Sequence, residues 1–119
     1  MAKVLIVDDD KTTVSLLATL LELDDFEVQS VGKGSGVLEL VDEYQPDVVL
    51  LDYHLSDMEG IEVLRDIRES ADHATLPVVV ASGLDVGNEV LKAGANRFLI
   101  KPFEPDELPI LFNKLIESR

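Results

Sequence analysis

Acidic side chains directly follow two of the most hydrophobic segments of this chain. The segment KVLIV runs into Asp8 and Asp9, and the segment VVLL runs into Asp52. Oxygen ligands of this kind suit a hard divalent cation such as Mg²⁺ (or Mn²⁺), and a carboxylate is also a nucleophile toward a phosphoryl group. Two such endings indicate a site built where buried strands reach the surface.

Two later segments end in groups that bind anions. The segment PVVVAS ends in Ser82, which carries a hydroxyl group, and the next residue, Gly83, offers an unhindered backbone amide. The segment NRFLIK ends in Lys101, which carries an ammonium group. The chain has no cysteine, which excludes thiolate ligands and cysteine nucleophiles. A phosphoryl group neutralised by Mg²⁺ and Lys101, with Asp52 as the in-line nucleophile, is the chemistry that this set of groups predicts.

Five runs rich in β-branched and aliphatic residues alternate with helical stretches, which predicts βαβ units and a parallel sheet. The strands are expected at residues 3–8, 26–31, 47–52, 77–82 and 96–101. The first, third and fourth runs are almost continuously apolar, as central strands are, whereas the second alternates like an edge strand. We therefore predict an α/β fold, namely a flavodoxin-like, doubly wound five-stranded sheet of order 2-1-3-4-5 with helices on both faces.

This strand order brings the acidic residues together. In an open parallel sheet, ligands bind outside the carboxyl ends of the strands, at the point where the connections diverge to opposite faces. For the predicted order that point lies between the first and third strands, so Asp8, Asp9 and Asp52 are expected to converge within a few ångströms. Crowded carboxylates raise one another's pKa or recruit a cation.

Helical stretches separate the strands and continue to the C-terminus. They are expected at residues 11–24, 36–44, 60–70 and 85–93 and in the last part of the chain. The first is expected to turn Thr13, Leu16, Leu17, Leu20 and Leu21 inward, and the last Ile110, Leu111, Leu115 and Ile116. Pro105 suits a first helical position, but Pro109 would remove a hydrogen bond, so the last helix is expected to start late or bend there.

Length and composition narrow the class of protein. The 119 residues are 46% hydrophobic and 29% charged, which fits one globular domain. No apolar run approaches the ~20 residues that span a bilayer, and no signal peptide precedes the first strand, so a cytoplasmic location is expected. A net charge of −14 disfavours direct contact with nucleic acid and with anionic membranes.

Short motifs at these positions resemble one known family. They are VDDD at 7–10, LLD at 50–52, Met58-Glu59-Gly60, Ala81-Ser82-Gly83, Ala93-Gly94-Ala95 and Lys101-Pro102-Phe103. In this order and at this spacing they resemble the CheY-like receiver domain of two-component response regulators. The resemblance covers essentially the whole chain, which implies a single receiver (response regulatory) domain over residues 1–119.

The resemblance implies roles for the acidic residues. Asp52 matches the aspartate that accepts a phosphoryl group, Asp9 a direct metal ligand, and Asp8 a ligand acting through water. The backbone carbonyl of His54 is expected to complete the protein's ligands to Mg²⁺. The phosphoryl donor is expected to be a histidine kinase or a histidine phosphotransfer protein, and the signal is expected to pass to a downstream effector domain or protein.

The resemblance also implies how the signal leaves the site. Lys101 matches the lysine that binds a phosphoryl oxygen, and the Lys101-Pro102 bond is expected to be cis. Ser82 matches the hydroxyl that moves toward the phosphoryl group, and Phe98 the aromatic that swings inward with it. Such a domain is a signalling switch that catalyses only its own phosphorylation and dephosphorylation.

Some positions depart from the family pattern or have two interpretations. Asp10 is expected to be a solvated loop residue or a helix cap, and His73 is expected to be exposed in a loop. His54 lies at a position where the family tunes the hydrolysis of the acyl phosphate, and Gly83 could have the same effect. For His54, a side chain that simply lies on the loop surface is an equal alternative. The 19-residue spacing from Ser82 to Lys101 is about one helical turn shorter than in familiar receivers, so the fourth helix, or the loop before it, is expected to be shortened.

Val14 and Ala18 form an i, i+4 pair beside the core stripe of the first helix, near the expected site. Isolated apolar residues are common on surfaces, so this pair is either an ordinary surface feature or a docking patch for a kinase or phosphotransfer protein.

Three alternatives concern the whole protein. The receiver is either a complete protein or part of a larger response regulator or hybrid kinase. A haloacid dehalogenase-type phosphatase also places an aspartate nucleophile after a parallel strand, but it needs a second aspartate two residues later, where this chain has His54. An interaction module that works without phosphorylation would predict loss of Asp9, Asp52 or Lys101, and all three are present.

Overall fold

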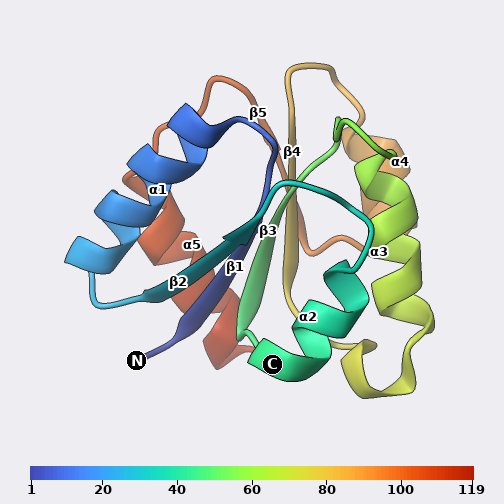
Figure 1. Ribbon diagram of the computed structural model, residues 1–119, viewed down its shortest axis with the longest axis horizontal. Helices are drawn as coiled ribbons and strands as arrows, with labels where there is room; N and C mark the ends of the chain where they lie inside the picture. Colours follow the sequence, from blue (N-terminus) through green and yellow to red (C-terminus); the bar gives the residue numbers. More distant parts are fainter.

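A five-stranded parallel sheet forms the centre of the computed structural model, which describes residues 1–119 (Figure 1). Its strands are β1 (Lys3–Val7), β2 (Glu27–Val31), β3 (Val48–Asp52), β4 (Val78–Ser82) and β5 (Arg97–Ile100). Neighbouring strands pair in the order β2-β1-β3-β4-β5, and every pair is parallel. This order confirms the predicted flavodoxin-like sheet, with β2 at one edge.

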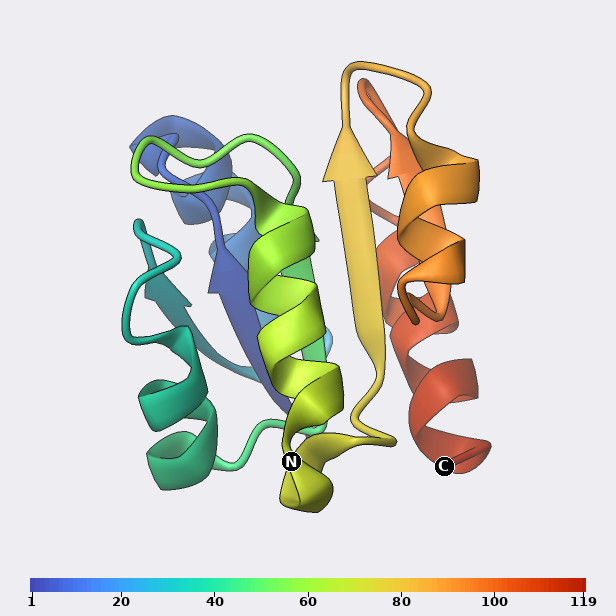
Figure 2. The same ribbon diagram turned by 90° about the vertical axis from the view of Figure 1, so that its right-hand side faces the viewer.

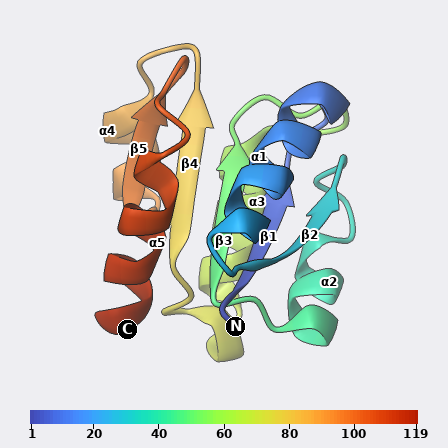
Figure 3. The ribbon, with the colours of Figure 1, turned by 90° about the vertical axis from the view of Figure 1, so that its left-hand side faces the viewer.

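Helices cover both faces of the sheet. They are α1 (Lys11–Leu23), α2 (Val37–Tyr44), α3 (Gly60–Glu69), α4 (Gly87–Lys92) and α5 (Glu107–Glu117), with a short 3₁₀ helix η1 (Ala71–His73) after α3. The helices α2, α3 and α4 lie on one face (Figure 2), and α1 and α5 lie on the other (Figure 3). None of the helices is both long enough and apolar enough to cross a membrane.

The core is divided into two layers by the sheet. Because side chains alternate along a strand, Leu5 and Val7 of β1 pack toward α2, α3 and α4, while Val4 and Ile6 pack toward α1 and α5. Burying each aliphatic side chain of this size contributes about 1.5–3 kcal/mol. The central strands are therefore buried on both faces, which holds their carboxyl ends in place.

The inward faces of α1 and α5 are narrower than the sequence analysis predicts. Leu17 and Leu21 are buried in α1, but Leu16 is 55% exposed, and Leu20 also faces solvent. In α5, Ile110 is 64% exposed, because the buried stripe runs through Leu108, Phe112 and Leu115 instead. The prediction for Leu16, Leu20 and Ile110 was wrong because only one stripe of a helix can face a sheet, and leucine-rich helices offer several.

Proline residues lie at the start of α5, and a glycine lies just after the end of α4. The helix α5 begins at Glu107, two residues after Pro105, so it starts late, but it starts before Pro109. The expectation that Pro109 removes a helical hydrogen bond was wrong. Pro109 is then the third helical residue, where its missing N–H has no intrahelical partner to lose. The expected short fourth helix is confirmed, since α4 has six residues, and Ala93 and then Gly94, whose φ is +111°, follow it.

His73 is buried, contrary to the prediction of an exposed loop residue. Its side chain lies in η1 with only 8% of the residue exposed, and Nε2 lies 2.5 Å from a carboxylate oxygen of Asp42 in α2. Arg68 of α3 donates a hydrogen bond to the His73 backbone carbonyl. The segment around His73 is polar, and the contacts that bury it come from distant parts of the chain, so the local sequence does not reveal them.

Candidate functional site

Three carboxylates meet where β1 and β3 end. Val7 and Leu51 are partners in the sheet register, so the residues that follow them, Asp8 and Asp52, lie side by side. One carboxylate oxygen from each of Asp8, Asp9 and Asp52 lies within 4.8 Å of the others. The predicted convergence is confirmed. Asp8 and Asp52 are buried, with 7% and 8% of each residue exposed, whereas Asp9 faces solvent.

Lys101 supplies the one cation that contacts this cluster. Its Nζ lies 3.4 Å from Oδ2 of Asp8 and 3.4 Å from Oδ1 of Asp52. The backbone of Lys101 is fixed because its N–H donates to the Ser82 carbonyl at 2.8 Å. The next peptide bond, Lys101-Pro102, is cis, the geometry that the resemblance implies. An ammonium group from β5 therefore faces carboxylates from β1 and β3.

Asp52 lies in an environment that opposes its negative charge. Burial raises the pKa of this carboxyl above its ordinary value, Lys101 offsets part of that rise, and the nearby charge of Asp8 adds to it. The His54 amide lies 3.4 Å from Oδ1, which is a weak interaction. Three carboxylates and one ammonium group leave an excess of negative charge, which a bound cation would neutralise.

The donors of this cluster fit a hard divalent cation. They are carboxylate oxygens from Asp8, Asp9 and Asp52, and no imidazole or thiolate belongs to the group. Mg²⁺ prefers oxygen ligands and is commonly held by one or two carboxylates together with water. The cluster could therefore hold a metal ion of this kind.

The side chain of His54 lies on the loop surface. The residue is exposed, its ring packs edge-on against the Tyr53 ring with centroids 4.8 Å apart, and it makes no side-chain hydrogen bond. Of the two interpretations of this histidine, the structure supports the surface position. The role of its backbone carbonyl as a metal ligand stays a prediction.

The β4–α4 loop and β5 hold the residues with expected switch roles. Ser82 is fully buried, and its Oγ accepts a hydrogen bond of 3.0 Å from the Leu84 amide. Gly83 is exposed and has open space where a Cβ would lie. Phe98 is half-buried and packs against α4, so close that a Cβ on Gly87 would lie 3.0 Å from Cδ2 of its ring.

Asp10 caps α1, which is one of the two roles expected for it. Its carboxylate accepts hydrogen bonds from the Thr12 amide at 3.1 Å and from the Thr13 hydroxyl at 2.7 Å. The bond from the Thr13 side chain is the main reason that the pKa of Asp10 is lowered. The third acidic residue after β1 therefore positions the helix and is not part of the carboxylate cluster.

Two contacts near the site were not anticipated from the sequence. Asp57, in the loop after β3, accepts hydrogen bonds from the amides of Gly34 and Ser35 in the loop after β2. Tyr53 donates a hydrogen bond to Glu89 of α4. Both contacts join segments more than 20 residues apart, so no local pattern signals them.

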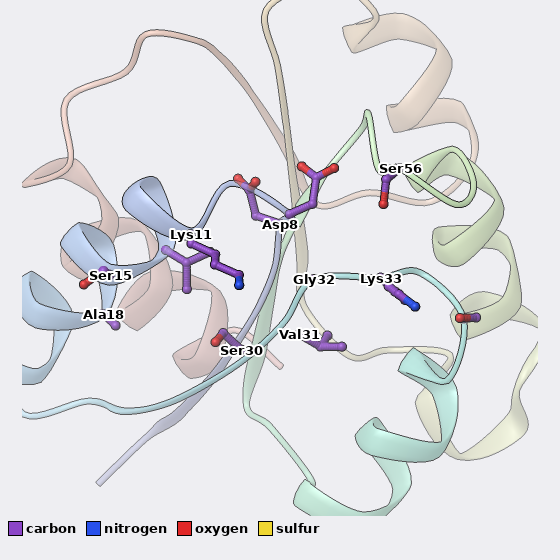
Figure 4. Close-up of a pocket in the computed structure, with 12 residues that line it drawn as sticks. Asp8, Lys11, Ser15, Ala18, Ser30, Val31, Gly32, Lys33 and Ser56 are labelled. Carbon is purple, nitrogen blue, oxygen red and sulfur yellow. The ribbon is translucent and has the colours of Figure 1, made fainter.

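A hollow of about 770 Å³ adjoins the carboxylate cluster (Figure 4). It lies between α1, β2 and the loops that follow β2 and β3, and both Asp8 and Asp9 line it. Val14 and Ala18 form part of its α1 wall, with Lys11 at the start of the same helix. The apolar pair singled out in the sequence therefore borders the cluster directly.

The flavodoxin-like sheet carries an acidic cluster at its switch point, faced by Lys101, and this is the arrangement that the resemblance to receiver domains implies. Comparison with known proteins agrees. Residues 4–113 match the family model described as "Response regulator receiver domain". The chain belongs to the response regulator receiver domain family.

Individual relatives support this assignment. The chain is 31% identical over 116 residues to regulatory protein AtoC of Escherichia coli, covering 97% of the chain and 25% of AtoC. It is 38% identical over 108 residues to the DNA-binding response regulator MtrA of Mycolicibacterium smegmatis, covering 89% and 46%. The receiver domain of Francisella response regulator 1452 superposes with a TM-score of 0.91 at 31% identity, covering 99% of this chain and 98% of that one.

These findings define the function at the level of the domain. The chain is a phosphoacceptor receiver domain of two-component signalling, and it acts as a signalling switch. It spans less than half the length of AtoC and MtrA.

Proposed function

We propose that Asp52 accepts a phosphoryl group from a histidine kinase or a histidine phosphotransfer protein, and that the modified domain signals to a downstream effector. One observation carries this proposal: Asp52 shares a cluster of carboxylates within 4.8 Å, and the Lys101 ammonium lies 3.4 Å from its oxygen. A buried carboxylate that belongs to an acidic cluster able to hold a cation, and that faces a fixed ammonium group, is equipped for phosphoryl transfer.

The proposed step joins a carboxylate oxygen of Asp52 to phosphorus. As that bond forms, the bond between phosphorus and the donor breaks, and its electron pair leaves with the donor, which takes up a proton. Lys101 donates hydrogen bonds to a phosphoryl oxygen and offsets its charge. Water later hydrolyses the acyl phosphate and restores Asp52, so the chain catalyses only its own phosphorylation and dephosphorylation.

The metal of this proposal is Mg²⁺ (or Mn²⁺), held by Asp8, Asp9 and Asp52 with the backbone carbonyl of His54. The all-oxygen donor set of the cluster supports this choice. When bound, the ion supplies positive charge that offsets the phosphoryl oxygens and the crowded carboxylates. Asp8 is itself fixed, since its Oδ1 accepts a 2.9 Å hydrogen bond from the Asp10 amide.

Ser82 and Phe98 are proposed to carry the response. The Ser82 hydroxyl now accepts a hydrogen bond from the Leu84 amide, so a turn toward the phosphoryl group would release that amide and change the β4–α4 loop. Phe98 would then move inward from its position against Gly87. Phosphorylation would thereby shift the population of two arrangements of this face.

The hollow beside the cluster is the proposed docking surface for the phosphoryl donor. Val14 and Ala18 line it together with Asp8 and Asp9, so a protein bound there would reach the acidic cluster. An Ala18→Arg variant should slow phosphoryl transfer from a cognate kinase. Thr19→Arg is the matched control, because Thr19 is exposed on the same helix and does not line the hollow.

Phosphorylation by a small acyl phosphate separates docking from chemistry. Because acetyl phosphate needs no docking surface, it should modify the Ala18→Arg variant as readily as the wild type. If the kinase also transfers to Ala18→Arg at an unchanged rate, the docking assignment is wrong.

Intact-mass measurement tests the central proposal. The wild type, incubated with acetyl phosphate and Mg²⁺, should gain a single phosphoryl adduct, while Asp52→Asn should gain none. An equal adduct on both proteins would refute the assignment of Asp52.

A further inference from the structure

Tyr53 lies next to the proposed phosphoacceptor and points to the opposite side of the sheet. Its neighbour Asp52 continues the side of β3 that faces α1 and α5, while the Tyr53 ring belongs to the core beneath α2, α3 and α4. The backbone of Tyr53 is held on both sides, because its N–H donates to the Ala81 carbonyl and its own carbonyl accepts from the Gly60 amide. The tyrosine is therefore a rigid extension of β3.

The phenol of Tyr53 connects this rigid point to α4. The residue is 7% exposed, and its hydroxyl donates a 3.0 Å hydrogen bond to a carboxylate oxygen of Glu89. This is the only side-chain hydrogen bond that joins α4 to another element, since the backbone bonds of the helix are local. The other attachments of α4 are apolar: Val90 is fully buried, and Gly87 packs on the Phe98 ring.

We propose that the Tyr53–Glu89 hydrogen bond is a latch that holds α4 in its resting position and is released when a phosphoryl group binds at Asp52. The inference rests on the proposed phosphoacceptor function. Any shift of the β4–α4 loop driven by Ser82, or of the Phe98 ring that touches Gly87, displaces a helix of only six residues. Tyr53 does not follow, because its backbone is hydrogen-bonded to Ala81 and Gly60.

The latch opposes activation through a simple linkage. A hydrogen bond that exists only in the resting arrangement lowers the population of the arrangement that binds phosphoryl groups best, and it therefore weakens apparent phosphoryl affinity. Removing one net hydrogen bond of ordinary strength should raise that affinity by about two- to tenfold. The latch thus determines what fraction of phosphorylated molecules adopt the active arrangement.

Binding of beryllofluoride, a mimic of the phosphoryl group, in the presence of Mg²⁺ tests the latch. Tyr53→Phe keeps the ring and removes only the hydroxyl, and it should raise the apparent affinity about two- to tenfold in a titration followed by the amide resonances of α4. Tyr44→Phe is the matched control: the only other tyrosine also donates a hydrogen bond, to the Glu27 carbonyl, far from α4. Its affinity should equal that of the wild type.

A double-mutant cycle with Glu89→Ala separates the latch from other effects of each change. The Tyr53→Phe and Glu89→Ala changes should not add, because either one removes the same bond, and thermal unfolding of each variant checks that it is folded. Equal affinities for wild type and Tyr53→Phe, a weaker affinity in Tyr53→Phe, or full additivity would overturn the latch while leaving the proposed function intact. Absence of any beryllofluoride binding by the wild type would overturn both proposals.

Discussion

Asp57 shows how a single side chain can hold two loops beside the site. Its two carboxylate oxygens accept hydrogen bonds of 2.9 Å from the Gly34 amide and 3.0 Å from the Ser35 amide. These backbone bonds lower the pKa of Asp57 from 3.8 to about 2. Because the folded value lies below the unfolded one, ionised Asp57 stabilises the fold fully above pH 3.8, and this contribution is lost as the pH falls through about 2.

Replacing Asp57 should therefore have a pH-dependent cost. Asp57→Asn presents only one acceptor oxygen to two amides, so its free energy of unfolding at pH 7 should be lower than that of the wild type. The difference should shrink when urea unfolding is repeated at pH 3. Asp66→Asn is the control, since Asp66 is exposed and its carboxylate accepts no hydrogen bond, so this variant should lower the free energy of unfolding at pH 7 less than Asp57→Asn does. A pH-independent deficit in Asp57→Asn would contradict this explanation.

At the residue scale, functional groups that directly follow a strand can be found in the sequence, whereas a loop residue whose partners are distant in the chain cannot. Asp8, Asp9, Asp52 and Lys101 each follow a hydrophobic run, and strand order alone brings them to one edge. Asp57 stands in a polar loop with no such signal. Its partners are more than 20 residues away, and only the folded chain shows them.

At the scale of elements, the start of α3 approaches the end of β3 more closely than a side chain allows. A Cβ on Gly60 would lie 2.3 Å from the Asp52 carbonyl oxygen and 2.9 Å from the Tyr53 Cα, both backbone atoms. The Gly60 amide donates to the Tyr53 carbonyl across the same contact. Glycine at this position therefore lets α3 pack directly against the segment that holds Asp52.

Gly60→Ala should destabilise the fold by about 1–3 kcal/mol, because backbone must move to admit the methyl group. It should also reduce acyl-phosphate labelling, since the shifted backbone carries Asp52. Gly83→Ala is the matched control: nothing lies within 4 Å of its Cβ position, so stability should change by no more than about 0.5 kcal/mol. Urea unfolding of both variants measures the difference, and equal stability of the two would contradict the close approach.

Elements differ in how well their sequences predict them. The central strands are short, continuous apolar runs rich in β-branched residues, as in a sheet that is covered on both faces, so their type and order could be predicted. The inward face of α1 could not, because leucines lie on several sides of the helix and packing selects Leu17 and Leu21. The prediction that His73 is exposed was wrong for a related reason. Its burial depends on a contact with Asp42 of α2, which the order of residues along the chain does not reveal.

At the scale of the whole molecule, a net charge of −14 makes folding work against self-repulsion. Negative charge is concentrated in the cluster of Asp8, Asp9 and Asp52, where two of the three carboxylates are buried. Added salt should screen the general repulsion, whereas Mg²⁺ should also bind the cluster and stabilise the folded state.

Thermal unfolding should separate these two effects. At equal ionic strength, Mg²⁺ at ten times its Kd should stabilise the wild type by about 1.4 kcal/mol more than NaCl does. Asp9→Asn should respond to NaCl as the wild type does but lose the additional effect of Mg²⁺. Addition of a chelator should reverse the Mg²⁺ effect in the wild type. An equal Mg²⁺ effect in both proteins would mean that the ion acts by screening alone.

Borohydride trapping with peptide mapping is the most direct test that Asp52 is the phosphoacceptor, because it locates the phosphorylated residue. Borohydride reduces an acyl phosphate to an alcohol, so an aspartyl phosphate becomes homoserine in the labelled chain. After treatment with acetyl phosphate and Mg²⁺, homoserine should be found at position 52 only, and omission of Mg²⁺ should strongly reduce it. Homoserine at Asp8 or Asp9, or labelling of position 52 that is indifferent to Mg²⁺, would contradict a phosphoacceptor site built from this carboxylate cluster.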